Sequence, residues 1–419
     1  MTINILVIGL GYVGLPLLVS LAEHFNVYGY DINKKRISEL KNKYDQNNEI
    51  KKNNLKKISK NIYSNIAELN KNINTYIITV PTPINKKNNP DLKFLINATK
   101  MVARRLKKND LIIYESTVYP GMTEEICVPV LEKASNLKLN EDFTLGYSPE
   151  RINPGDKKNN IKNVIKIISA SNNKGINIMK KIYSKILINK PFVAESIKIA
   201  EAAKVIENAQ RDINIAFMNE LSQIFSALDI NTNKVLEAAS TKWNFNKYYP
   251  GLVGGHCIGV DPYYLAYKSK TKGYYPKFIL QGRKINNSMP KFIVSKILKN
   301  LNINISKINC LVLGISFKEN VNDIRNSKVI DLCNLIKKKN IKFDVYDPLL
   351  SISDKLILSK VFKFTNNIKF KKYNLVILAV NHTIFNEINF NKFKKDTIIF
   401  QIRSFISQKI RSKIITLWF

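Results

Sequence analysis

A glycine pattern near the start of the chain limits its fold more than any other feature of the sequence. Gly9, Gly11 and Gly14 follow an apolar, β-branched run over residues 3–8 and open an apolar stretch over residues 15–24. In such a pattern the first glycine permits a tight turn, the second lets the backbone approach a pyrophosphate, and the third lets helix and strand pack closely. The pattern therefore predicts a strand, a turn and a helix whose N-terminus binds a dinucleotide.

The second strand of this unit is predicted over residues 27–30 and ends at Asp31. Asp31 would accept hydrogen bonds from the ribose hydroxyls and repel a 2′-phosphate, which favours NAD over NADP. Arg36 would lie over the adenine or ribose edge, which weakens the preference for NAD over NADP. Tyr12 and Val13, inside the turn, are also expected to contact the cofactor. Another α/β protein with a glycine turn is the alternative interpretation.

Further strand-like runs at residues 75–80, 111–115 and 143–147 alternate with helical ones. This alternation implies a parallel, doubly wound sheet, in which ligands bind at the carboxyl ends of the strands. Thr82 and Thr117 follow two of these runs and would contact the nicotinamide half or a catalytic water. Ordinary turn chemistry accounts for either threonine equally well.

Residues 196–228 contain no proline or glycine and carry apolar residues at near-helical spacing, which predicts an unusually long helix. Such a helix would connect two domains and pack against a partner subunit. Lys204 and Asn208 lie one turn apart on a face shared with Glu201 and with Arg211 or Asp212. An ammonium and an amide directed at one point suit the stabilisation of an oxyanion. The alternative is a solvated polar face.

Cys257 is the candidate nucleophile. It lies in Gly254-Gly-His-Cys-Ile-Gly-Val-Asp261, a glycine-rich turn where the backbone allows a ligand to approach closely. A nearby His256 or a helix start would raise the fraction of thiolate. Asp261 places a carboxylate four residues beyond the thiol. The alternative is a loop cysteine without a catalytic role.

The four cysteines (Cys127, Cys257, Cys310 and Cys333) are far apart and form no Cys-x-x-Cys pair. Their spacing argues against a metal site or a disulfide framework and is typical of a reducing cytosol. We therefore expect a cytoplasmic protein. The uncharged run over residues 3–22 contains the glycine turn, so it predicts a buried strand and helix and no membrane anchor.

The net charge of +35 suggests nucleic-acid binding at first sight. The basic residues are spread along the whole chain, however, and only nine of the 67 are arginines, which indicates a compositional bias toward lysine. We expect no specific nucleic-acid partner. Where lysine is the common choice, an arginine suggests a need for its planar fork; those beside motifs are Arg36, Arg151, Arg211, Arg283 and Arg325.

A second α/β unit begins with a strand predicted over residues 308–313, followed by Gly314. A helix over residues 328–339 and a strand over residues 343–346 come next, with later strands at 375–380 and 397–401. The single glycine predicts a nucleotide-binding fold without a tight pyrophosphate cradle. The expected fold is α/β, with two Rossmann-like, doubly wound domains joined by a long central helix and a helical middle domain. The expected boundaries are 1–195, 196–300 and 301–419.

These motifs together resemble the UDP-glucose/GDP-mannose dehydrogenase family, over essentially the whole chain. The resemblance rests on seven segments: Gly9-Leu-Gly-Tyr-Val-Gly-Leu-Pro16, Ser116-Thr-Val-Tyr-Pro-Gly121, Ser148-Pro-Glu-Arg-Ile-Asn-Pro-Gly155, Ala203-Lys-Val-Ile-Glu-Asn208, Arg211-Asp-Ile-Asn-Ile-Ala-Phe217, Gly254-Gly-His-Cys257 and Phe317-Lys-Glu-Asn-Val-Asn-Asp-Ile-Arg325. The Cys257 signature is similar to that of the branch acting on UDP-N-acetylglucosamine or UDP-N-acetylgalactosamine, for acidic surface polysaccharides.

The resemblance implies a four-electron oxidation at sugar C6, with NAD as acceptor and Cys257 as carrier of a thiohemiacetal and then a thioester. It implies that Lys204 and Asn208 steady the oxyanions. Asp261 and Thr117 would order a water, and Glu150 would act as base for thioester hydrolysis. It also implies a homodimer formed through the central helix.

The resemblance further implies substrate contacts from ten residues: Glu150, Arg151, Ile152, Lys204, Asn208, Arg211, Gly254, Phe317, Lys318 and Arg325. One departure concerns Gln401-Ile-Arg403, which stands where many members have Asp-x-Lys/Arg. The missing carboxylate puts the family role of Arg403 in doubt.

Two other activities remain open at this stage. UDP-N-acetylmannosamine or UDP-glucose would be oxidised by the same chemistry. A more remote alternative is a single-step NAD-dependent dehydrogenase of a 3-hydroxy acid, which shares the two-part layout and a helix lysine but has no need for a loop cysteine.

Overall fold

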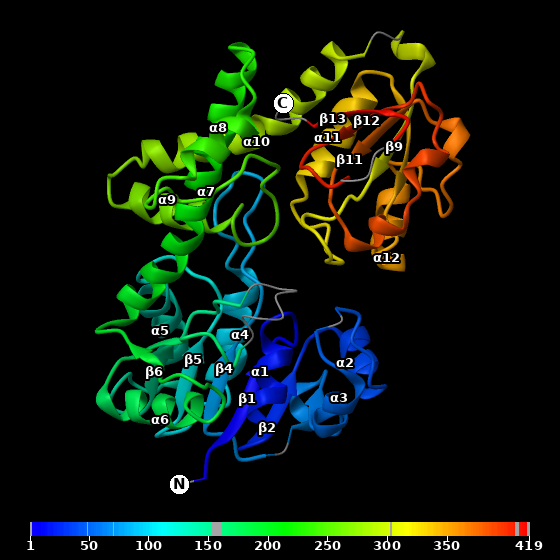
Figure 1. Ribbon diagram of the computed structural model, residues 1–419. Coiled ribbons are helices and arrows are strands. Elements are labelled where there is room, and N and C mark those ends of the chain that lie inside the picture. The colour runs from blue at the N-terminus through cyan, green and yellow to red at the C-terminus, as the bar shows by residue number, and fades with distance from the viewer. Residues whose placement is uncertain are drawn as a thin grey trace. The chain divides into compact units, whose positions relative to one another are not determined.

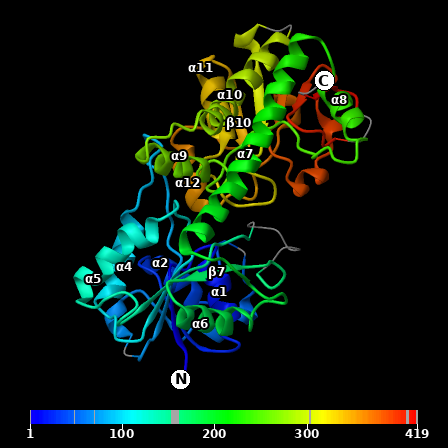
Figure 2. The same ribbon diagram turned by 90° about the vertical axis from the view of Figure 1, so that its left-hand side faces the viewer.

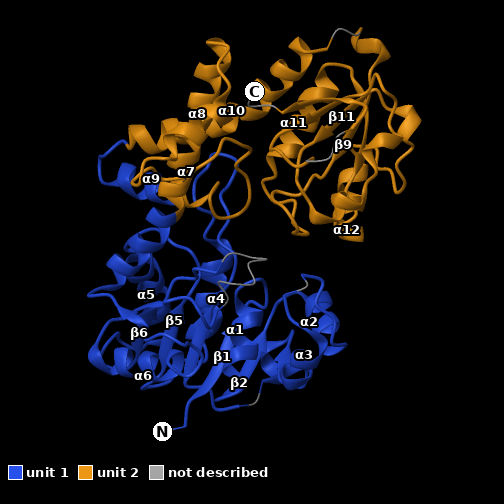
Figure 3. Cartoon of the chain, in the orientation of Figure 1, with its two compact units in different colours: residues 1–207, 263–275 blue, residues 208–262, 276–419 orange. Residues whose placement is uncertain are grey.

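The computed structural model describes residues 2–47, 49–69, 71–152, 161–301, 304–406 and 410–416. The chain divides into two compact units (Figure 3). Unit 1 comprises Met1–Glu207 and Tyr263–Tyr275, and unit 2 comprises Asn208–Pro262 and Pro276–Phe419. Each unit contains its own sheet and its own apolar core.

Unit 1 is built on an eight-stranded sheet in the order β3-β2-β1-β4-β5-β6-β7-β8 (Figure 1). All neighbouring strands are parallel except β6 and β7. This confirms the expected doubly wound sheet. The strands are β1 Asn4–Ile8, β2 Asn26–Tyr30, β3 Ile62–Tyr63, β4 Thr75–Ile78, β5 Leu111–Tyr114, β6 Thr144–Tyr147, β7 Ile167–Ala170 and β8 Phe192–Val193.

The helices of unit 1 lie against this sheet and bury apolar side chains on it. Leu17, Leu55 and Ile182 come from three different helices and share one core cluster with strand residues. Each such buried side chain contributes about 1.5–3 kcal/mol of hydrophobic stabilisation. The helices are α1 Gly14–Leu21, α2 Lys34–Lys41, α3 Lys52–Ile58, α4 Lys93–Ala103, α5 Val128–Ser135 and α6 Asn173–Tyr183.

A long helix, α7, runs over Ile197–Ala227 and agrees closely with its predicted range (Figure 2). It begins in unit 1 and ends in unit 2. In unit 2 it is joined to α10 by a buried ion pair, since Arg283 lies 2.5 Å from Asp212. The remaining helices of the middle region are α8 Thr232–Ala239, α9 Asp261–Thr271 and α10 Lys277–Lys299.

Unit 2 contains a five-stranded, fully parallel sheet in the order β10-β9-β11-β12-β13. The second Rossmann-like sheet of the expected fold is therefore confirmed. Its elements are β9 Asn309–Leu313, α11 Lys328–Lys338, β10 Lys342–Tyr346, α12 Ile352–Ser359, β11 Leu375–Leu378, β12 Ile398–Gln401 and β13 Lys413–Thr416. Met289 of α10 and Leu332 of α11 pack against the strand residue Val312.

Short helical turns complete the structure at Ile66–Glu68, Thr123–Cys127, Ile305–Lys307, Phe370–Lys372, Thr383–Glu387 and Phe390–Lys392. None of the helices in the described part of the chain combines the length and the apolar character that crossing a membrane requires.

Candidate active site

The turn between β1 and α1 has the geometry that a dinucleotide requires. Gly9 adopts a φ of +93°, and a Cβ on Gly14 would lie 1.9 Å from the Gly9 carbonyl oxygen. A Cβ on Gly11 would have nothing within 4 Å, so this position borders open space. The N-terminus of α1 has no side-chain cap at Val13, which leaves its N–H groups for a ligand. The turn fits the pyrophosphate of NAD.

The end of β2 completes this turn. One oxygen of Asp31 accepts a hydrogen bond from the Leu10 N–H at 2.8 Å, and the other accepts one from the Asn33 N–H. Arg36 is 6% exposed; its Nε donates to the Leu10 carbonyl, and it forms an ion pair with Asp45. Arg36 therefore supports the turn from within the protein. Its predicted contact with the adenine or ribose stays a prediction.

The loops that carry the two threonines lie side by side. Ser116, beside Thr117, donates its hydroxyl hydrogen bond to the Val80 carbonyl at 2.7 Å. The Thr82 carbonyl accepts a hydrogen bond from the buried Tyr264 hydroxyl at 2.9 Å. Thr82 and Thr117 are half-buried, after β4 and β5 respectively. They occupy the strand ends where this fold binds ligands.

Glu201 fixes the loop after Thr117 to the first turns of α7. Its carboxylate accepts hydrogen bonds from the Gly121 N–H, the Thr123 N–H and the Thr123 hydroxyl. Burial raises the pKa of Glu201 to about 7, although these hydrogen bonds act to lower it. Glu201 therefore acts as a positioning residue between the loop and the helix.

Glu150 borders a buried charged cluster. One of its oxygens accepts hydrogen bonds from the N–H groups of Arg151 and Ile152. The other is buried, lies 3.8 Å from the Lys166 ammonium and has no hydrogen-bond partner among the described residues. Two backbone N–H groups and the charge of Lys166 thus hold the carboxylate in place.

Lys166 is the centre of that cluster. It is 4% exposed and lies 2.8 Å from the carboxylate of Glu115, which also accepts a hydrogen bond from the Tyr183 hydroxyl. Burial acts to lower the pKa of Lys166, but Glu115 and Glu150 outweigh it and raise that pKa. The sequence analysis did not identify Lys166 or Glu115. The available signal was a lysine inside the apolar run of residues 164–168.

Other predicted residues of unit 1 have partners of their own. Arg151 donates to the Ile165 carbonyl and forms an ion pair with Glu207 of α7 at 2.7 Å. Ile152 packs against the apolar core. Their substrate contacts stay predictions.

Lys204 and Asn208 are both buried, with 6% and 9% exposure, so they do not belong to a solvated helix face. In unit 2, the Asn208 amide donates a hydrogen bond to Asp261 at 2.6 Å. Asp261 is itself buried at the start of α9. Arg211, by contrast, is exposed. The structure thus joins two of the predicted catalytic side chains directly.

The Cys257 loop leads into α9, because the Cys257 carbonyl accepts hydrogen bonds from the N–H groups of Val260 and Asp261. Cys257 is partly exposed, whereas the other three cysteines are buried. Asn219 of α7 holds the segment before the loop through two hydrogen bonds with the Gly251 backbone. The thiol is therefore fixed in place yet accessible.

Glycines allow this loop to pack closely on the segment that follows β9. A Cβ on Gly254 would lie 2.4 Å from the Asn326 carbonyl oxygen. Gly255 has a φ of +86°, and a Cβ there would lie 2.7 Å from the Phe317 ring. Asn326 also donates to the Gly255 carbonyl. The Cys257 loop and the 317–326 loop thus form one packed structure.

Two predicted substrate cations lie on the 317–326 loop. Lys318 places its ammonium 5.7 Å from the Phe317 ring. Arg325 forms a two-pronged ion pair with Asp323 and keeps 47% of its side chain exposed. An exposed guanidinium near the carboxyl end of β9 is well placed for an anionic ligand.

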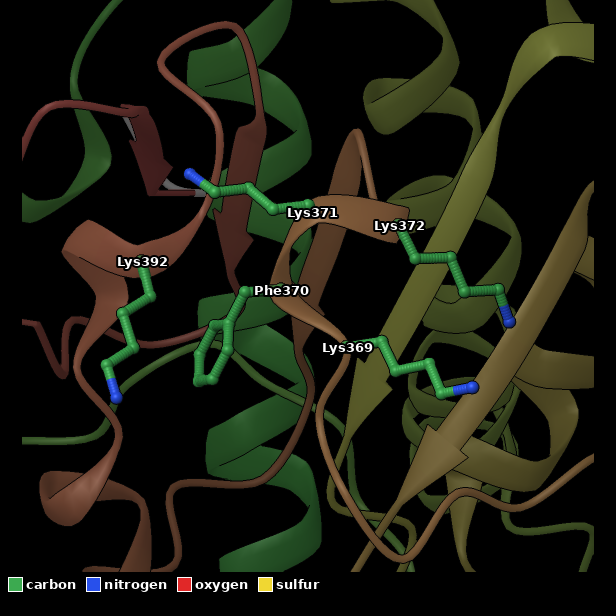
Figure 4. Close-up of a pocket in the computed structure, with 5 residues that line it drawn as sticks. All are labelled: Lys369, Phe370, Lys371, Lys372 and Lys392. Carbon is green, nitrogen blue, oxygen red and sulfur yellow. The ribbon is translucent and has the colours of Figure 1, made fainter.

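Two hollows in unit 2 are lined by residues other than these. One, of about 450 Å³, is lined by Phe370 and four lysines, and Figure 4 shows the lysine side chains extending to different sides of the ring. It lies before β11, at the amino end of the sheet, where this fold does not bind its ligand. The other, of about 770 Å³, includes Arg403, Lys247 and Tyr249. Within the described ranges, no cluster of His, Cys, Asp or Glu could hold a metal ion.

Three consecutive stretches of the chain match known domains. They are an NAD-binding domain over residues 3–187, a central domain over residues 198–288 and a UDP-binding domain over residues 311–408. The chain is thus an NAD-dependent nucleotide-sugar dehydrogenase. It belongs to the UDP-glucose/GDP-mannose dehydrogenase family.

Similar proteins cover nearly the whole chain. The UDP-N-acetyl-D-glucosamine 6-dehydrogenase of Salmonella typhi is 46% identical over 92% of this chain and 91% of its own length. Protein CapL of Staphylococcus aureus is 46% identical over 96% of both chains. The solved structure of a UDP-D-ManNAc dehydrogenase from Pyrococcus horikoshii matches with a TM-score of 0.86 at 28% identity, over 99% of both chains.

Two glycines of the cofactor turn should respond differently to alanine. Gly14→Ala should destabilise unit 1 by about 1–3 kcal/mol or more, because its methyl would overlap the Gly9 carbonyl. Gly11→Ala should leave stability within about 0.5 kcal/mol but weaken NAD binding about tenfold, because its methyl enters the cofactor's space. Urea unfolding and NAD titration measure the two effects. Equal NAD affinity in wild type and Gly11→Ala would contradict this placement.

Removal of the buried lysine should be costly. Lys166→Met leaves the buried Glu115 carboxylate without its cation, which should lower the free energy of unfolding by about 3–5 kcal/mol. The double change with Glu115→Gln should recover part of that loss. Lys162→Met, at an exposed position, is the control and should cost less than about 0.5 kcal/mol. Urea denaturation of wild type, both single variants, the double variant and the control decides whether the pair is coupled.

Proposed function

We propose that this enzyme oxidises the C6 hydroxymethyl group of a UDP-N-acetylhexosamine, with UDP-N-acetylglucosamine as the first choice, to the carboxylate. The single observation that carries the proposal is the accessible Cys257 thiol in a glycine loop whose next helix begins with Asp261, bonded to Asn208. The name of the similar protein from Salmonella typhi supports the substrate, and the role in acidic surface polysaccharides is the one that the resemblance implies.

The overall reaction converts the alcohol, two NAD⁺ and one water into the carboxylate, two NADH and three protons. NAD, when bound, supplies the hydride acceptor for both oxidations. Cys257 forms a bond to C6 of the aldehyde after the first oxidation, and the C=O electron pair moves to oxygen. After the second oxidation water cleaves the thioester, and the S–C6 electron pair returns to sulfur. Covalent capture prevents the aldehyde from escaping.

The other predicted catalytic residues serve these steps. Lys204 and Asn208 stabilise the oxyanions through an ammonium and an amide donor. Asp261 orients Asn208 directly, and Asp261 and Thr117 order the water. Glu150 acts as the base in thioester hydrolysis.

Substrate binding uses the predicted cations. Arg325 and Lys318 bind the diphosphate or sugar, supported by the exposure of the Arg325 guanidinium and its fork geometry. Arg151 and Arg211 contribute from the other predicted segments, and Gly254, Phe317 and Ile152 shape the site.

The division into 1–195, 196–300 and 301–419 remains our proposal for the functional domains. We also place the enzyme in the cytoplasm, because its four cysteines are unpaired thiols.

UDP-N-acetylmannosamine stays the second candidate substrate, since a structural relative carries that substrate in its name.

The stoichiometry of the reaction tests the proposed function. A panel of UDP-GlcNAc, UDP-GalNAc, UDP-ManNAc and UDP-glucose should yield two NADH per sugar consumed for the true substrate, measured by absorbance and mass spectrometry of the product. One NADH per sugar, with an aldehyde or ketone accumulating, would instead support a single-step dehydrogenase.

Cys257→Ser should lower kcat by about 10³-fold or more, because the serine hydroxyl is not ionised at neutral pH. NAD affinity should stay unchanged. The matched control is Cys333→Ser, at a buried cysteine of the same unit, which should keep turnover if the protein folds. Full activity of Cys257→Ser would refute the covalent step.

We propose that α7 forms the homodimer. Its end in unit 2 exposes Phe217 and Ile224, and the exposed Leu228 follows directly after the helix; the three recur at helical spacing and form an apolar stripe. The double variant Phe217→Glu/Ile224→Glu should be a monomer by multi-angle light scattering. The control is Ile305→Glu, at an exposed apolar residue outside α7. A wild-type monomer at micromolar concentration would contradict the proposal.

A further inference from the structure

His382 is a fully buried histidine that none of the proposed catalytic or binding roles uses. It follows β11, at the carboxyl end of the second sheet. The strand order β10-β9-β11 places three strand ends next to one another there, and residues that follow all three contact this ring. Ser316 and Asn320 belong to the loop after β9, and Asp347 directly follows β10. The imidazole therefore joins three segments at the edge where this fold binds its ligand.

The hydrogen bonds determine where the imidazole proton lies. The backbone N–H of Asn320 donates to Nδ1 of His382 at 2.9 Å, and a backbone N–H can only donate. Nδ1 therefore carries no proton, and the neutral ring carries its proton on Nε2. That nitrogen lies 3.2 Å from the Ser316 hydroxyl oxygen and 3.3 Å from a carboxylate oxygen of Asp347. Both oxygens accept, so each ring nitrogen has a partner.

These bonds continue from the ring to the backbone of Lys318. Ser316 accepts from Nε2, so its own hydroxyl proton is left for the Lys318 carbonyl, 2.9 Å away. Lys318 is thus enclosed between two residues, Ser316 and Asn320, that both bond to one imidazole. Asn320 adds a further link, because its side-chain oxygen accepts hydrogen bonds from the N–H and the hydroxyl of Thr383. The turn that carries Lys318 is therefore fixed to the segment after β11 at several points.

The surroundings of the ring favour this one arrangement. The Phe385 ring meets the imidazole edge to face, with centroids 5.2 Å apart and planes at 75°. Rotation of the imidazole by half a turn would put a carbon opposite the Asn320 N–H, and a buried donor without a partner is unfavourable. A proton on Nδ1 would set two donors opposite each other. Either change would release the Asn320 end of the turn.

We propose that neutral His382, with its proton on Nε2, is a positioning residue for the proposed substrate cation Lys318. The inference rests on the proposed function, because that function assigns Lys318 to the UDP-sugar. An ammonium on a flexible stem binds an anion better when its backbone is held, since less conformational freedom is lost on binding. His382 contacts the turn, and the turn presents the cation to the nucleoside diphosphate.

UDP alone is the probe, because its binding requires neither turnover nor knowledge of the sugar. Isothermal titration calorimetry of the full chain should show that His382→Leu weakens UDP binding about tenfold, with NAD affinity within about twofold of wild type. NAD affinity is the internal reference, because the NAD-binding domain covers residues 3–187. A folded His382→Leu protein with wild-type UDP affinity would overturn the proposal.

The matched control is Tyr373→Phe. Tyr373 is buried at the opposite end of β11, and its hydroxyl donates to Asp344. The variant loses a buried hydrogen bond of the same sheet, so it should lower stability but leave UDP affinity unchanged.

A double-mutant cycle separates a positioning role from a general effect on folding. Lys318→Met should weaken UDP binding by itself, because the cation is gone. If His382 acts through Lys318, His382→Leu should cost little more in the Lys318→Met protein, so the two losses should not add. Additive losses would overturn the proposal, since the ring would then act through another group.

Two measurements decide the question if His382→Leu does not fold. Ser316→Ala removes the hydroxyl between the ring and the Lys318 carbonyl, and it should weaken UDP binding about threefold without adding to Lys318→Met. NMR of the wild-type protein labelled with ¹⁵N-histidine needs no variant of His382. The chain has three histidines, so His24→Gln and His256→Gln assign the remaining signals to His382. A proton on Nδ1 at neutral pH would refute the inference.

The outcomes distinguish this inference from the proposed function. Unchanged UDP affinity in His382→Leu refutes the role of His382 and leaves a yield of two NADH per sugar unaffected. One NADH per sugar, together with weakened and non-additive UDP binding in the variants, refutes the proposed function but supports the positioning role. Circular dichroism of each variant shows whether it is folded.

Discussion

One hydrogen bond recurs at the start of both sheets, and the nucleotide-binding halves depend on it. A carboxylate at the end of the second strand accepts the N–H that follows the glycine turn, from Leu10 to Asp31 in unit 1 and from Ile315 to Asp347 in unit 2. This bond satisfies a donor that the tight turn removes from the strand ladder. It also fixes two neighbouring strand ends relative to each other. Asp31 stays half-exposed, but Asp347 is buried and contacts His382.

The same turn therefore serves different purposes in the two units. In unit 1 the acid has surface left for a ligand, and the uncapped helix end lies beside it. In unit 2 the acid is used within the core, and the proposed substrate cations lie on another loop. The 317–326 loop carries those cations and packs on the Cys257 loop through Gly254 and Gly255. The proposed nucleophile and the proposed substrate cations consequently belong to one packed part of unit 2.

The sequence predicted the elements that depend on local pattern. Both glycine turns, the strands predicted from apolar runs and the long helix lie within a few residues of their expected places. It gave no bounds for α10, where Pro290 inside the helix breaks the usual pattern. It also missed β13, a short strand after Arg411. Such elements form because tertiary packing overrides a weak local preference.

Motifs mark part of the proposed site in the sequence, whereas burial, which the sequence does not record, distinguishes the rest. Lys204 was found because it lies one turn from Asn208, but Lys166 was indistinguishable from many surface lysines until its burial was seen. Asp323 likewise needed the loop packing that places it against His256. The sequence pattern does not show which charged side chains become buried on folding.

The arginines show why composition still helps in such a chain. Arg36, Arg151, Arg283 and Arg325 each form an ion pair with an acid, at Asp45, Glu207, Asp212 and Asp323. A carboxylate pays a large desolvation penalty on burial unless a partner satisfies it, and a planar fork does so with two hydrogen bonds. In a protein whose surface is mostly lysine, selection for arginine therefore marks positions where geometry as well as charge is required. Arg325 meets both demands, because the fork that binds Asp323 also leaves a cationic edge exposed.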